Sequence, residues 1–524
     1  MYSTSIVFDA VGQVLHSPLT LPIVVVCTIA IILHRVFCVY TSLLRDIPGP
    51  FIARLTPLHL EASTVRGRMA AYGLSHMHTH GDIFVCQPRS VCISDPSDIR
   101  RILSSSSFHK SPYYRVLQFT GIDSIISTSE PHAVSMKRRM LGPFFSTSYI
   151  SKMEHIVVQY GARAICNRWT KLLEQSQDQR IQINYEATFS MCTFNVISRL
   201  VFGQDIAALD PRAPEESLKW MTDATTYMSI RALLRLLPSF VFRAVTWPWE
   251  HLYDKFTDHV RTSIDTRAQL LREKCEERPV DLLQALMDCT DPESKVTLQE
   301  EEIHAESLLL LIGGIDPTAY TLTWTLHMLM LYPQCYEQLK HEIRSHFPSQ
   351  EISYAMAKDK LPYLEACIYE SMRLVPVPHV MIPRIVPNAG TTIKGHYLPP
   401  GTTVFANIVG SHLNPTHWPD PHRFDPTRFL DPHTRRTAIH SVFTFGYGNR
   451  ICMGKHLAWL NMTTILANLL QKFDFSLPDG YTRTGPNVID PATGHPKLMD
   501  RTEFITAKPA NHHLDCMLVV TSVK

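Results

Sequence analysis

The chain has 524 residues, 45% of them hydrophobic and 19% charged, so it can build a large apolar core and is neither a disordered nor a collagen-like polymer. Its 50 Lys and Arg residues nearly balance its 48 Asp and Glu residues, and no basic tract stands out, which argues against a nucleic-acid-binding protein. Twelve cysteines without a C-x-x-C pair also argue against a disulfide scaffold, a zinc ribbon and a thioredoxin-type site.

The N-terminal segment is almost entirely apolar from Pro18 to Tyr40. About 20 helical residues cross the hydrocarbon core of a bilayer, so residues 18–40 are expected to form one transmembrane signal anchor. Arg35 and Arg45 lie at its end and beyond it, and no basic residue precedes it, which places residues 1–17 in the lumen and the remainder in the cytosol. A cleaved signal peptide is the alternative, but it would need a basic n-region and a small-residue cleavage site, and both are missing.

Residues 41–50 end in Pro48-Gly49-Pro50, which stops a helix and predicts a hinge. No repeat or composition break follows, so residues 51–524 are expected to form a single domain. Helical periodicity dominates it, and we expect helices over 153–173, 218–237, 256–276, 300–331, 361–374 and 455–473. Short strands are expected at 83–91 and 402–408, so any sheet is small and assembled from distant segments. The predicted fold class is mainly α with a small β region.

The first candidate site is a glycine-rich loop around Cys452, directly before the helix expected at 455. Glycines allow close backbone approach, Arg450 supplies a fixed cation, and the dipole of the following helix favours a thiolate. One cysteine without Cys or His partners cannot build a tetrahedral zinc site, but it suffices as the single axial ligand of a haem. From these local features alone, a buried cysteine in a glycine-rich turn is an equally good interpretation.

The full loop, Phe445-Gly446-x-Gly448-x-Arg450-x-Cys452-x-Gly454, resembles the haem-binding signature of the cytochrome P450 superfamily, F-x-x-G-x-R-x-C-x-G, at every fixed position. The resemblance implies a P450 fold in which Cys452 is the axial thiolate of iron protoporphyrin IX. It also implies that Arg450 binds a haem propionate and that Phe445 packs against the sulfur side.

A second motif pairs Glu370 with Arg373, which the i, i+3 spacing puts on one face of the helix expected at 361–374. Alone, this pair is more simply read as part of a solvated helix face. Residues 424–429 read Phe-Asp-Pro-Thr-Arg-Phe and resemble the family's F-x-P-E-R-F segment, with Thr427 in place of the Glu. The resemblance adds Arg428 and implies a buried Glu-Arg-Arg clamp that locks the fold and takes no part in catalysis.

A third motif, Gly313-Gly314-Ile315-Asp316-Pro317-Thr318, lies inside the apolar helix expected at 300–331. Pro317 cannot donate a hydrogen bond to the carbonyl of Gly313, so we expect a kink that turns this oxygen toward a cavity. A kink without chemistry is the alternative. The motif resembles the family's oxygen-activation groove, A/G-G-x-D/E-T-T, which implies Asp316 as the acid of a proton relay.

This motif departs from the family directly after the acid, where a Thr normally supplies a hydroxyl. Pro317 occupies that position, and Thr318, the second catalytic candidate, comes one place late. One residue turns a helix by about 100°, so Thr318 cannot simply replace the missing hydroxyl. Proton delivery is then expected to rely on water, on a hydroxyl of the substrate or on a local rewinding around Pro317.

Two further arginines resemble propionate contacts of the family. Arg138, within Lys137-Arg138-Arg139, resembles the arginine of the C-helix segment, although Val134 stands where the family has an aromatic residue or His. Arg384 follows a turn that contains two prolines, and a plain surface arginine is its alternative interpretation.

The sequence contains no Rossmann fingerprint, P-loop or flavin motif, so reducing equivalents must come from outside the chain. The resemblance implies O₂ and NADPH-cytochrome P450 reductase, with cytochrome b5 as an optional second donor. The segments 361–364 and 412–415 look fungal, and the match is closest to microsomal members. This implies a single-pass protein of the endoplasmic reticulum membrane with a cytosolic catalytic domain.

The resemblance implies a monooxygenase that oxidises an apolar small molecule, such as a terpenoid or polyketide of secondary metabolism. Two alternatives stay open. Pro317 favours an isomerase, dehydratase or peroxygenase of the same fold that needs no reductase. A catalytically silent membrane scaffold is the second alternative. Fold and family do not fix the substrate.

Overall fold

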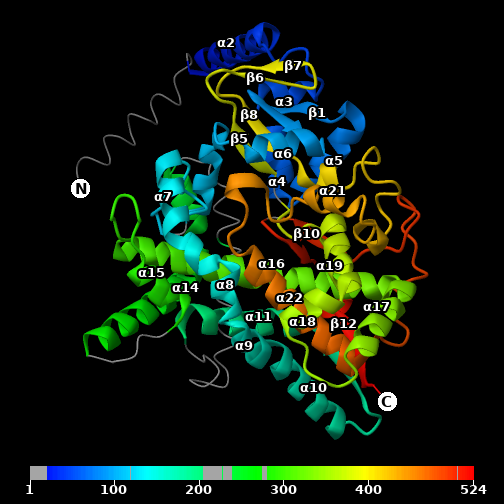
Figure 1. Cartoon of the computed structure of the whole chain (residues 1–524). Coiled ribbons are helices and arrows are strands. Elements are labelled where there is room, and N and C mark those ends of the chain that lie inside the picture. Colours follow the sequence, from blue (N-terminus) through cyan, green and yellow to red (C-terminus); the bar gives the residue numbers. More distant parts are fainter. Residues whose placement is uncertain are drawn as a thin grey trace.

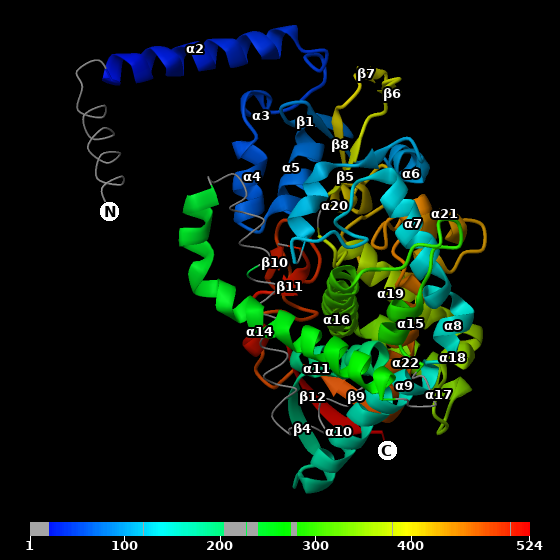
Figure 2. The same cartoon turned by 90° about the vertical axis from the view of Figure 1, so that its left-hand side faces the viewer.

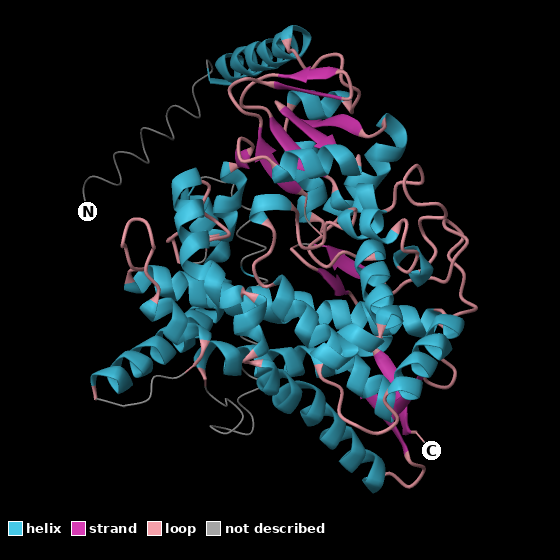
Figure 3. Cartoon of the chain, in the orientation of Figure 1, coloured by secondary structure: helices cyan, strands magenta, loops and turns pink. Residues whose placement is uncertain are grey.

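The computed structural model describes residues 20–118, 120–203, 227, 239–273, 280–379, 381–503 and 505–523. The predicted helix over 218–237 and the predicted lumenal residues 1–17 therefore lie outside the described residues, Tyr227 excepted. Figure 3 shows that helices dominate the molecule and that the largest group of strands gathers at one end of it. This agrees with the predicted class, mainly α with a small β region.

The apolar N-terminal segment forms helix α2 (Thr20–Thr41), which runs along the outer edge of the molecule (Figures 1 and 2). It exposes large apolar side chains, among them Val26, Leu33 and Phe37. Across the described ranges, no helix meets the length and apolarity needed to span a bilayer. The predicted helix is therefore present, whereas its role as a transmembrane anchor is not confirmed.

The segment expected to be a hinge is packed against the body of the molecule. Ile47 is buried, and the amide of Val85 donates to the carbonyl of Pro48 at 2.8 Å. A Cβ atom on Gly49 would lie 2.7 Å from the carbonyl oxygen of Val85, so only glycine allows this close approach. Arg54 also donates to the carbonyls of Leu44, Arg45 and Ile47. Helix α2 already ends at Thr41, before the two prolines, and the connection that contains them is held by these contacts.

The helices of the body follow the predicted periodicity closely. The residues predicted at 300–331, 361–374 and 455–473 form α16 (Glu300–Leu331), α19 (Pro362–Leu374) and α22 (Lys455–Lys472). Those predicted at 153–173 form α9 (Glu154–Ile156), the π-helix η3 (Val157–Arg163) and α10 (Ala164–Gln175) in succession. The helix predicted at 256–276 is α14 (Ser239–Arg272), which begins much earlier.

The remaining helices are α3 (Phe51–Leu55), α4 (Leu58–Val65), α5 (Met69–His80), α6 (Pro96–Ser104), η1 (Pro112–Leu117), α7 (Pro131–Leu141), η2 (Gly142–Phe145), α8 (Thr147–Ser151), α11 (Tyr185–Phe202), α15 (Leu282–Asp288), α17 (Pro333–His346), α18 (Tyr354–Lys360), α20 (Ile408–His412), η4 (Pro426–Phe429), α21 (Arg435–His440), η5 (Gly448–Arg450) and α23 (His512–Asp515).

The strands come from distant parts of the chain, as predicted. They are β1 (Ile83–Gln87), β2 (Ser90–Ile93), β3 (His109–Lys110), β4 (Arg180–Asn184), β5 (Ile382–Ile385), β6 (Thr391–Ile393), β7 (His396–Leu398), β8 (Thr403–Ala406), β9 (Phe473–Ser476), β10 (Arg501–Glu503), β11 (Ala507–Pro509) and β12 (Met517–Ser522). The largest sheet has the order β1-β2-β8-β5-β3, with β2 and β8 parallel. The strand predicted at 83–91 is in fact the β1–β2 hairpin, which turns at Arg89 with φ 56°.

Helix α16 runs through the middle of the helical part, where α11, α14, α15, α19 and α22 surround it (Figure 2). It continues without interruption through Pro317. A Cβ atom on Gly314 would lie 3.0 Å from the side chain of Ile197 in α11, so this glycine lets the two helices pack closely. The loop with the candidate cysteine, residues 443–454, leads directly into α22.

Candidate functional site

The candidate cysteine is held by a loop that depends on its glycines. The amide of Cys452 donates to the carbonyl of Phe445 at 2.8 Å, which closes the loop. Gly448 has φ 69°, and a Cβ atom there would lie 2.5 Å from the Cα of Ser104 and 2.6 Å from the carbonyl oxygen of Leu103. A side chain at this position would break the packing of the loop against α6. Steric exclusion of any side chain therefore explains why the motif has glycine here.

Cys452 is one of two described cysteines that are exposed, the other being Cys38 in α2. Burial of its surroundings raises the pKa of the Cys452 thiol, whereas the amide of Gly454 and the charges of Arg138 and Lys455 lower it. The residue thus keeps accessible surface although the surrounding protein desolvates its sulfur. In the described ranges, the one group of three metal-ligand side chains lies elsewhere, so Cys452 offers a single sulfur ligand.

The three arginines predicted as propionate contacts lie within electrostatic reach of one another. Arg138 donates to the carbonyl of Ile451 at 3.1 Å, and Arg450 donates to the carbonyl of Phe108 at 3.0 Å. Arg384 is only 4% exposed and donates to the hydroxyl of Tyr114 at 2.9 Å, while its Nε has no hydrogen-bond partner among the described residues. Burial and the charges of Arg384 and Arg138 lower the pKa of Arg450.

A fourth cation, Lys110, completes this cluster. Burial and, after it, the positive charges of Arg384, Arg450 and Arg138 lower the pKa of Lys110 to about 7, against the opposing effect of Glu306. Gathering four desolvated cations is unfavourable unless an anion lies among them. The arrangement therefore fits a bound ligand with two negative charges, such as the propionates of a haem.

The ion-pair partners of Lys137, Arg138 and Arg139 show which of these three residues is available for such a ligand. Lys137 and Arg139 of α7 each form an ion pair with a neighbouring segment. Lys137 binds Glu306 at 2.9 Å, and Arg139 binds Asp291 at 2.9 Å. Arg138 has no carboxylate partner in the part of the chain that the structure describes, and it reaches the loop of Cys452. The structure thus separates the three basic residues by geometry and leaves Arg138 facing the candidate site.

The predicted clamp residues meet in a buried ion-pair network. Arg373 donates to both carboxylate oxygens of Glu370, at 2.6 and 2.8 Å, and both side chains are fully buried. Arg428 adds a third contact to Glu370 at 3.3 Å. The remaining donors of Arg373 bind the carbonyls of His412, Pro421 and Arg423. Every member is satisfied, so the cluster fixes the segment before the Cys452 loop to α19.

The central turn of α16 has one open face. Gly313 is exposed although it lies in the middle of a buried helix, and a Cβ atom there would approach only Leu309 of the same helix. Pro317 follows it by one turn on the same face. Thr318 is buried and follows Gly314 by one turn, so it lies on the face that packs against α11. The structure does not bring Thr318 to the open face. As the sequence indicates, the shift of one residue rotates its side chain by about 100° around the helix.

Asp316 is buried next to this open face. The pKa of Asp316 is raised to about 7, mainly by burial; the charge of Lys508 opposes this shift, and that of Glu186 adds to it. A carboxyl with this pKa can carry a proton at neutral pH.

The predicted packing residue, Phe445, is partly buried. Its carbonyl accepts the Cys452 amide, and the Nζ of Lys455 lies 5.9 Å from its ring. It thus belongs to the loop that fixes the sulfur.

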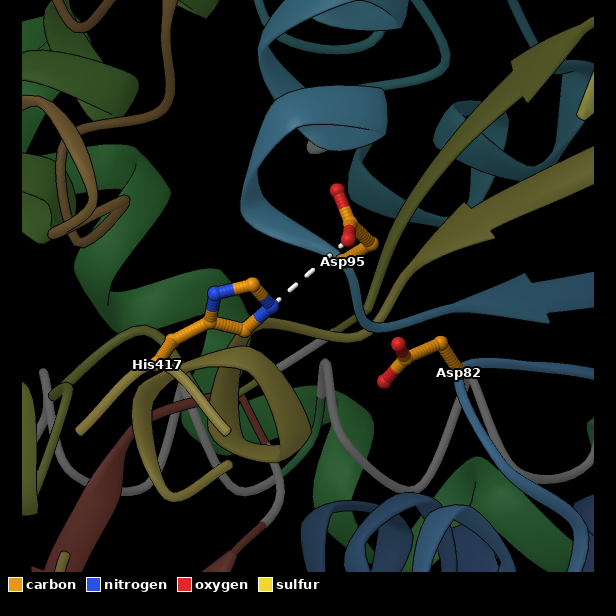
Figure 4. A group of neighbouring side chains, drawn as sticks. All are labelled: Asp82, Asp95 and His417. Carbon is orange, nitrogen blue, oxygen red and sulfur yellow. Dashed lines mark ion pairs between the residues drawn. The ribbon is translucent and has the colours of Figure 1, made fainter. Parts of the chain in front are cut away.

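A separate group, Asp82, Asp95 and His417, has the residue types of a metal site (Figure 4). His417 lies 3.5 Å from Asp95. However, the Nζ of Lys394 is 2.6 Å from Asp95 and 3.7 Å from Asp82, so a lysine already neutralises these carboxylates. Asp95 also caps α6. We interpret the group as a surface ion-pair network.

The sequence profile of the family described as cytochrome P450 matches residues 60–488, most of the chain. The chain therefore belongs to the cytochrome P450 family. The predicted class, a haem-thiolate monooxygenase, is confirmed by this match and by its relatives. The cofactor of the family is a haem, and its members use O₂ and electrons from a partner reductase.

The chain is 36% identical over 483 residues to "Cytochrome P450 monooxygenase helB1" of Aspergillus fumigatus, covering 92% of this chain and 82% of that protein. It is 37% identical to "Cytochrome P450 monooxygenase helB2" of the same fungus, covering 93% and 95% of the two chains. In fold it is similar to the structure titled "Crystal structure of cytochrome P450DA heme domain", with a TM-score of 0.73, 20% identity and coverage of 91% and 98%. The two Aspergillus fumigatus relatives confirm the predicted fungal character.

The described residues fit a haem. The single exposed cysteine can bind the iron. The cluster of desolvated cations can bind the propionates, and the open glycine face of α16 leaves room for the flat porphyrin ring. Lys110 and Tyr114 were not predicted, because β3 and η1 carry no motif and only the fold brings them to Arg384.

Proposed function

We propose that the chain is a membrane-anchored monooxygenase that oxygenates an apolar small molecule of fungal secondary metabolism, such as a terpenoid or polyketide. The observation that carries this proposal is the exposed residue Cys452, whose sulfur is desolvated and lies within electrostatic reach of Arg138 and Lys455. Bound haem supplies the oxygen-activating chemistry, and the electrons come from NADPH-cytochrome P450 reductase, with cytochrome b5 as a second donor.

The residues of this chain take distinct roles in the proposal. Cys452 holds the iron as a thiolate, and Phe445 packs on the sulfur side. Arg138, Arg384 and Arg450 bind the propionates, because their guanidiniums lie together without a carboxylate between them. The buried Glu370 network holds the loop of Cys452 in register with α19.

Proton delivery in this proposal depends on Asp316. Its pKa of about 7 lets it hold and release a proton at neutral pH, and it adjoins the open face of α16. Pro317 has no hydroxyl, and Thr318 lies on the opposite side toward α11. Water or a hydroxyl of the substrate must therefore pass the proton from Asp316 to the open face.

The proposed location is the endoplasmic reticulum membrane, with residues 51–524 in the cytosol. The apolar character of residues 18–40 and the exposed apolar residues Phe51, Ile52 and Leu58 of α3 and α4 support it. Fractionation of cells that express the tagged chain tests this, because a protein released by alkaline carbonate is not anchored.

The ferrous–CO spectrum of the purified protein tests the haem site, and Cys452→Ala is expected to abolish the thiolate-type band. Product formation by the protein with reductase, O₂ and NADPH then tests the reaction, and a mass gain of one oxygen is expected in extracts of expressing cells. A wild-type protein that binds no haem would contradict the proposal.

A second candidate is a P450-fold isomerase, dehydratase or peroxygenase, which the position of Pro317 on the open face of α16 favours. Equal turnover without NADPH and O₂ would decide for it. A catalytically silent scaffold predicts instead that Cys452→Ala keeps the biological function at an unchanged protein level.

A further inference from the structure

A short segment, Asp123–Ser127, is held by three buried charged side chains from three different elements. Lys110 comes from β3, Lys137 from α7 and Glu306 from α16. Their exposed fractions are 9%, 2% and 2%. Burying so many ionic groups is unfavourable unless each has a partner with good geometry, so the partners of these three side chains indicate what they stabilise.

The partners are mainly backbone groups of this segment. Lys110 Nζ donates to the carbonyls of Ile125 at 2.7 Å and Ile126 at 3.1 Å. Lys137 Nζ donates to the carbonyl of Asp123 at 2.8 Å. A carboxylate oxygen of Glu306 accepts the amide of Ile125 at 2.8 Å and binds Lys137 at 2.9 Å. The segment has no regular secondary structure, so these bonds replace a sheet or helix in fixing its backbone.

The segment lies next to the open face of α16. Glu306 precedes Gly313 by two helical turns, about 10 Å along the axis, on the same face. The partly buried side chains of Ile125 and Ile126 border the same apolar cluster as Leu310 of α16 and Met453, the neighbour of Cys452. Through Glu306 and Lys110, the segment is thus fixed between α16 and the cation cluster of the candidate haem site.

Lys110 also belongs to the cation cluster of the candidate haem site. The charges of Arg384, Arg450 and Arg138 act on it, as the lowered pKa of Lys110 indicates. A propionate bound to these arginines would favour the charged form of Lys110, and a charged amine is the stronger donor to the carbonyls of Ile125 and Ile126. The segment is therefore connected to the bound cofactor through one side chain.

We propose that Lys110, Lys137 and Glu306 form a positioning network that holds Asp123–Ser127 over the haem pocket and thereby sets the affinity of the enzyme for bulky apolar ligands. The inference rests on the proposed haem site. The network acts through the backbone of the segment, and none of its three side chains needs to touch the ligand. Loss of one member leaves buried groups unpaired and lets the segment move away from the pocket.

Two probes that bind iron through the same imidazole nitrogen separate this role from a general effect. Imidazole itself does not reach the segment, whereas 1-dodecylimidazole carries an apolar tail that must pass through the pocket. Spectral titration of the haem-loaded Lys110→Met and Glu306→Gln variants should show affinity for 1-dodecylimidazole reduced about tenfold, the ordering cost of a few residues, with affinity for imidazole within about twofold of wild type. The exposed α10 residues Lys171 and Glu174 supply the matched controls Lys171→Met and Glu174→Gln.

Hydrogen exchange gives an independent readout. Amides of residues 124–128 should exchange faster in both variants than in the wild-type holoenzyme, while those of α10 are unchanged. If a single variant does not fold, the double variant Lys137→Met with Glu306→Leu removes both buried charges together and keeps the interior apolar. It should show the same selective loss for 1-dodecylimidazole.

Wild-type affinity for both probes together with wild-type exchange in residues 124–128 would overturn the inference, as would an equal loss for both probes. Failure of the haem site itself is recognised separately, because the wild-type protein would then lack the thiolate-type ferrous–CO band. Variants that keep this band but lose the long-chain azole support the inference.

Discussion

The ion-pair network around Glu370 makes the sharpest prediction about stability. In Glu370→Gln, the guanidinium of Arg373 stays buried and keeps its three backbone carbonyls, but it loses the carboxylate that neutralises it. Breaking a buried ion pair from one side destabilises a protein by about 3–5 kcal/mol. We expect this loss in the free energy of unfolding, together with faster loss of haem, because the network fixes the segment that leads to Cys452.

An exposed pair with the same chemistry supplies the control. Arg163 donates to both carboxylate oxygens of Glu351 at 2.9 Å, and the two side chains are 50% and 42% exposed. Glu351→Gln should therefore lower the free energy of unfolding by no more than about 1 kcal/mol. Chemical denaturation of the haem-loaded proteins, followed by the Soret band and by circular dichroism, measures both variants. A similar small loss in Glu370→Gln and Glu351→Gln would refute the reasoning that burial sets the magnitude.

Three further predictions concern the active site. Because the pKa of Asp316 is raised from 3.8 to about 7, its contribution to stability is complete below pH 3.8 and lost as the pH rises through 7, and turnover should also fall above pH 7. Asp316→Asn should flatten both pH profiles, measured by denaturation and by product formation. Pro317→Thr restores a hydroxyl beside Gly313 and should yield more product and less hydrogen peroxide per NADPH; an unchanged ratio would show that water already serves this step. Arg384→Met removes one of the clustered cations and should speed haem transfer to apomyoglobin about tenfold, whereas Lys171→Met should not.

The sequence predicts elements well where one periodicity continues and poorly where the backbone turns without a glycine signal. The bounds of α16 agree with the prediction because its apolar pattern runs past Pro317 and the surrounding helices bury it on nearly all sides. The sequence predicts one strand in place of the β1–β2 hairpin because Arg89, and no glycine, adopts the positive φ of the turn. The prolines and glycine of residues 41–50 predict a hinge, but they carry no sign of the contacts that Arg54 and Val85, outside the motif, make with this segment.

The residues of the candidate site also differ in how far the sequence predicts them. A local motif identifies Cys452. The close contact of Gly448 with α6 explains why the motif has a glycine at a fixed distance from this cysteine. The Glu370 network was recognisable only because Arg428 lies in a second motif of the family. Lys110 and Glu306 could not be predicted, since each belongs to a segment whose pattern indicates only secondary structure. Their role arises when β3 and α16 are packed on either side of the same short segment.

The proton path follows from the orientation of residues 313–321 of α16, which make about two and a half helical turns. Pro317 shares the open face of Gly313 but has no hydroxyl, and Thr318 lies toward α11. Thr321, one turn after Pro317, donates its hydroxyl to the carbonyl of Pro317 at 2.7 Å, so that proton is already engaged in the helix. This leaves Asp316 as the side chain of this region that both lies beside the open face and exchanges a proton near pH 7. In the proposed reaction, the pH dependence of turnover should therefore follow the titration of Asp316, and replacement of Thr318 by Val should leave that dependence unchanged.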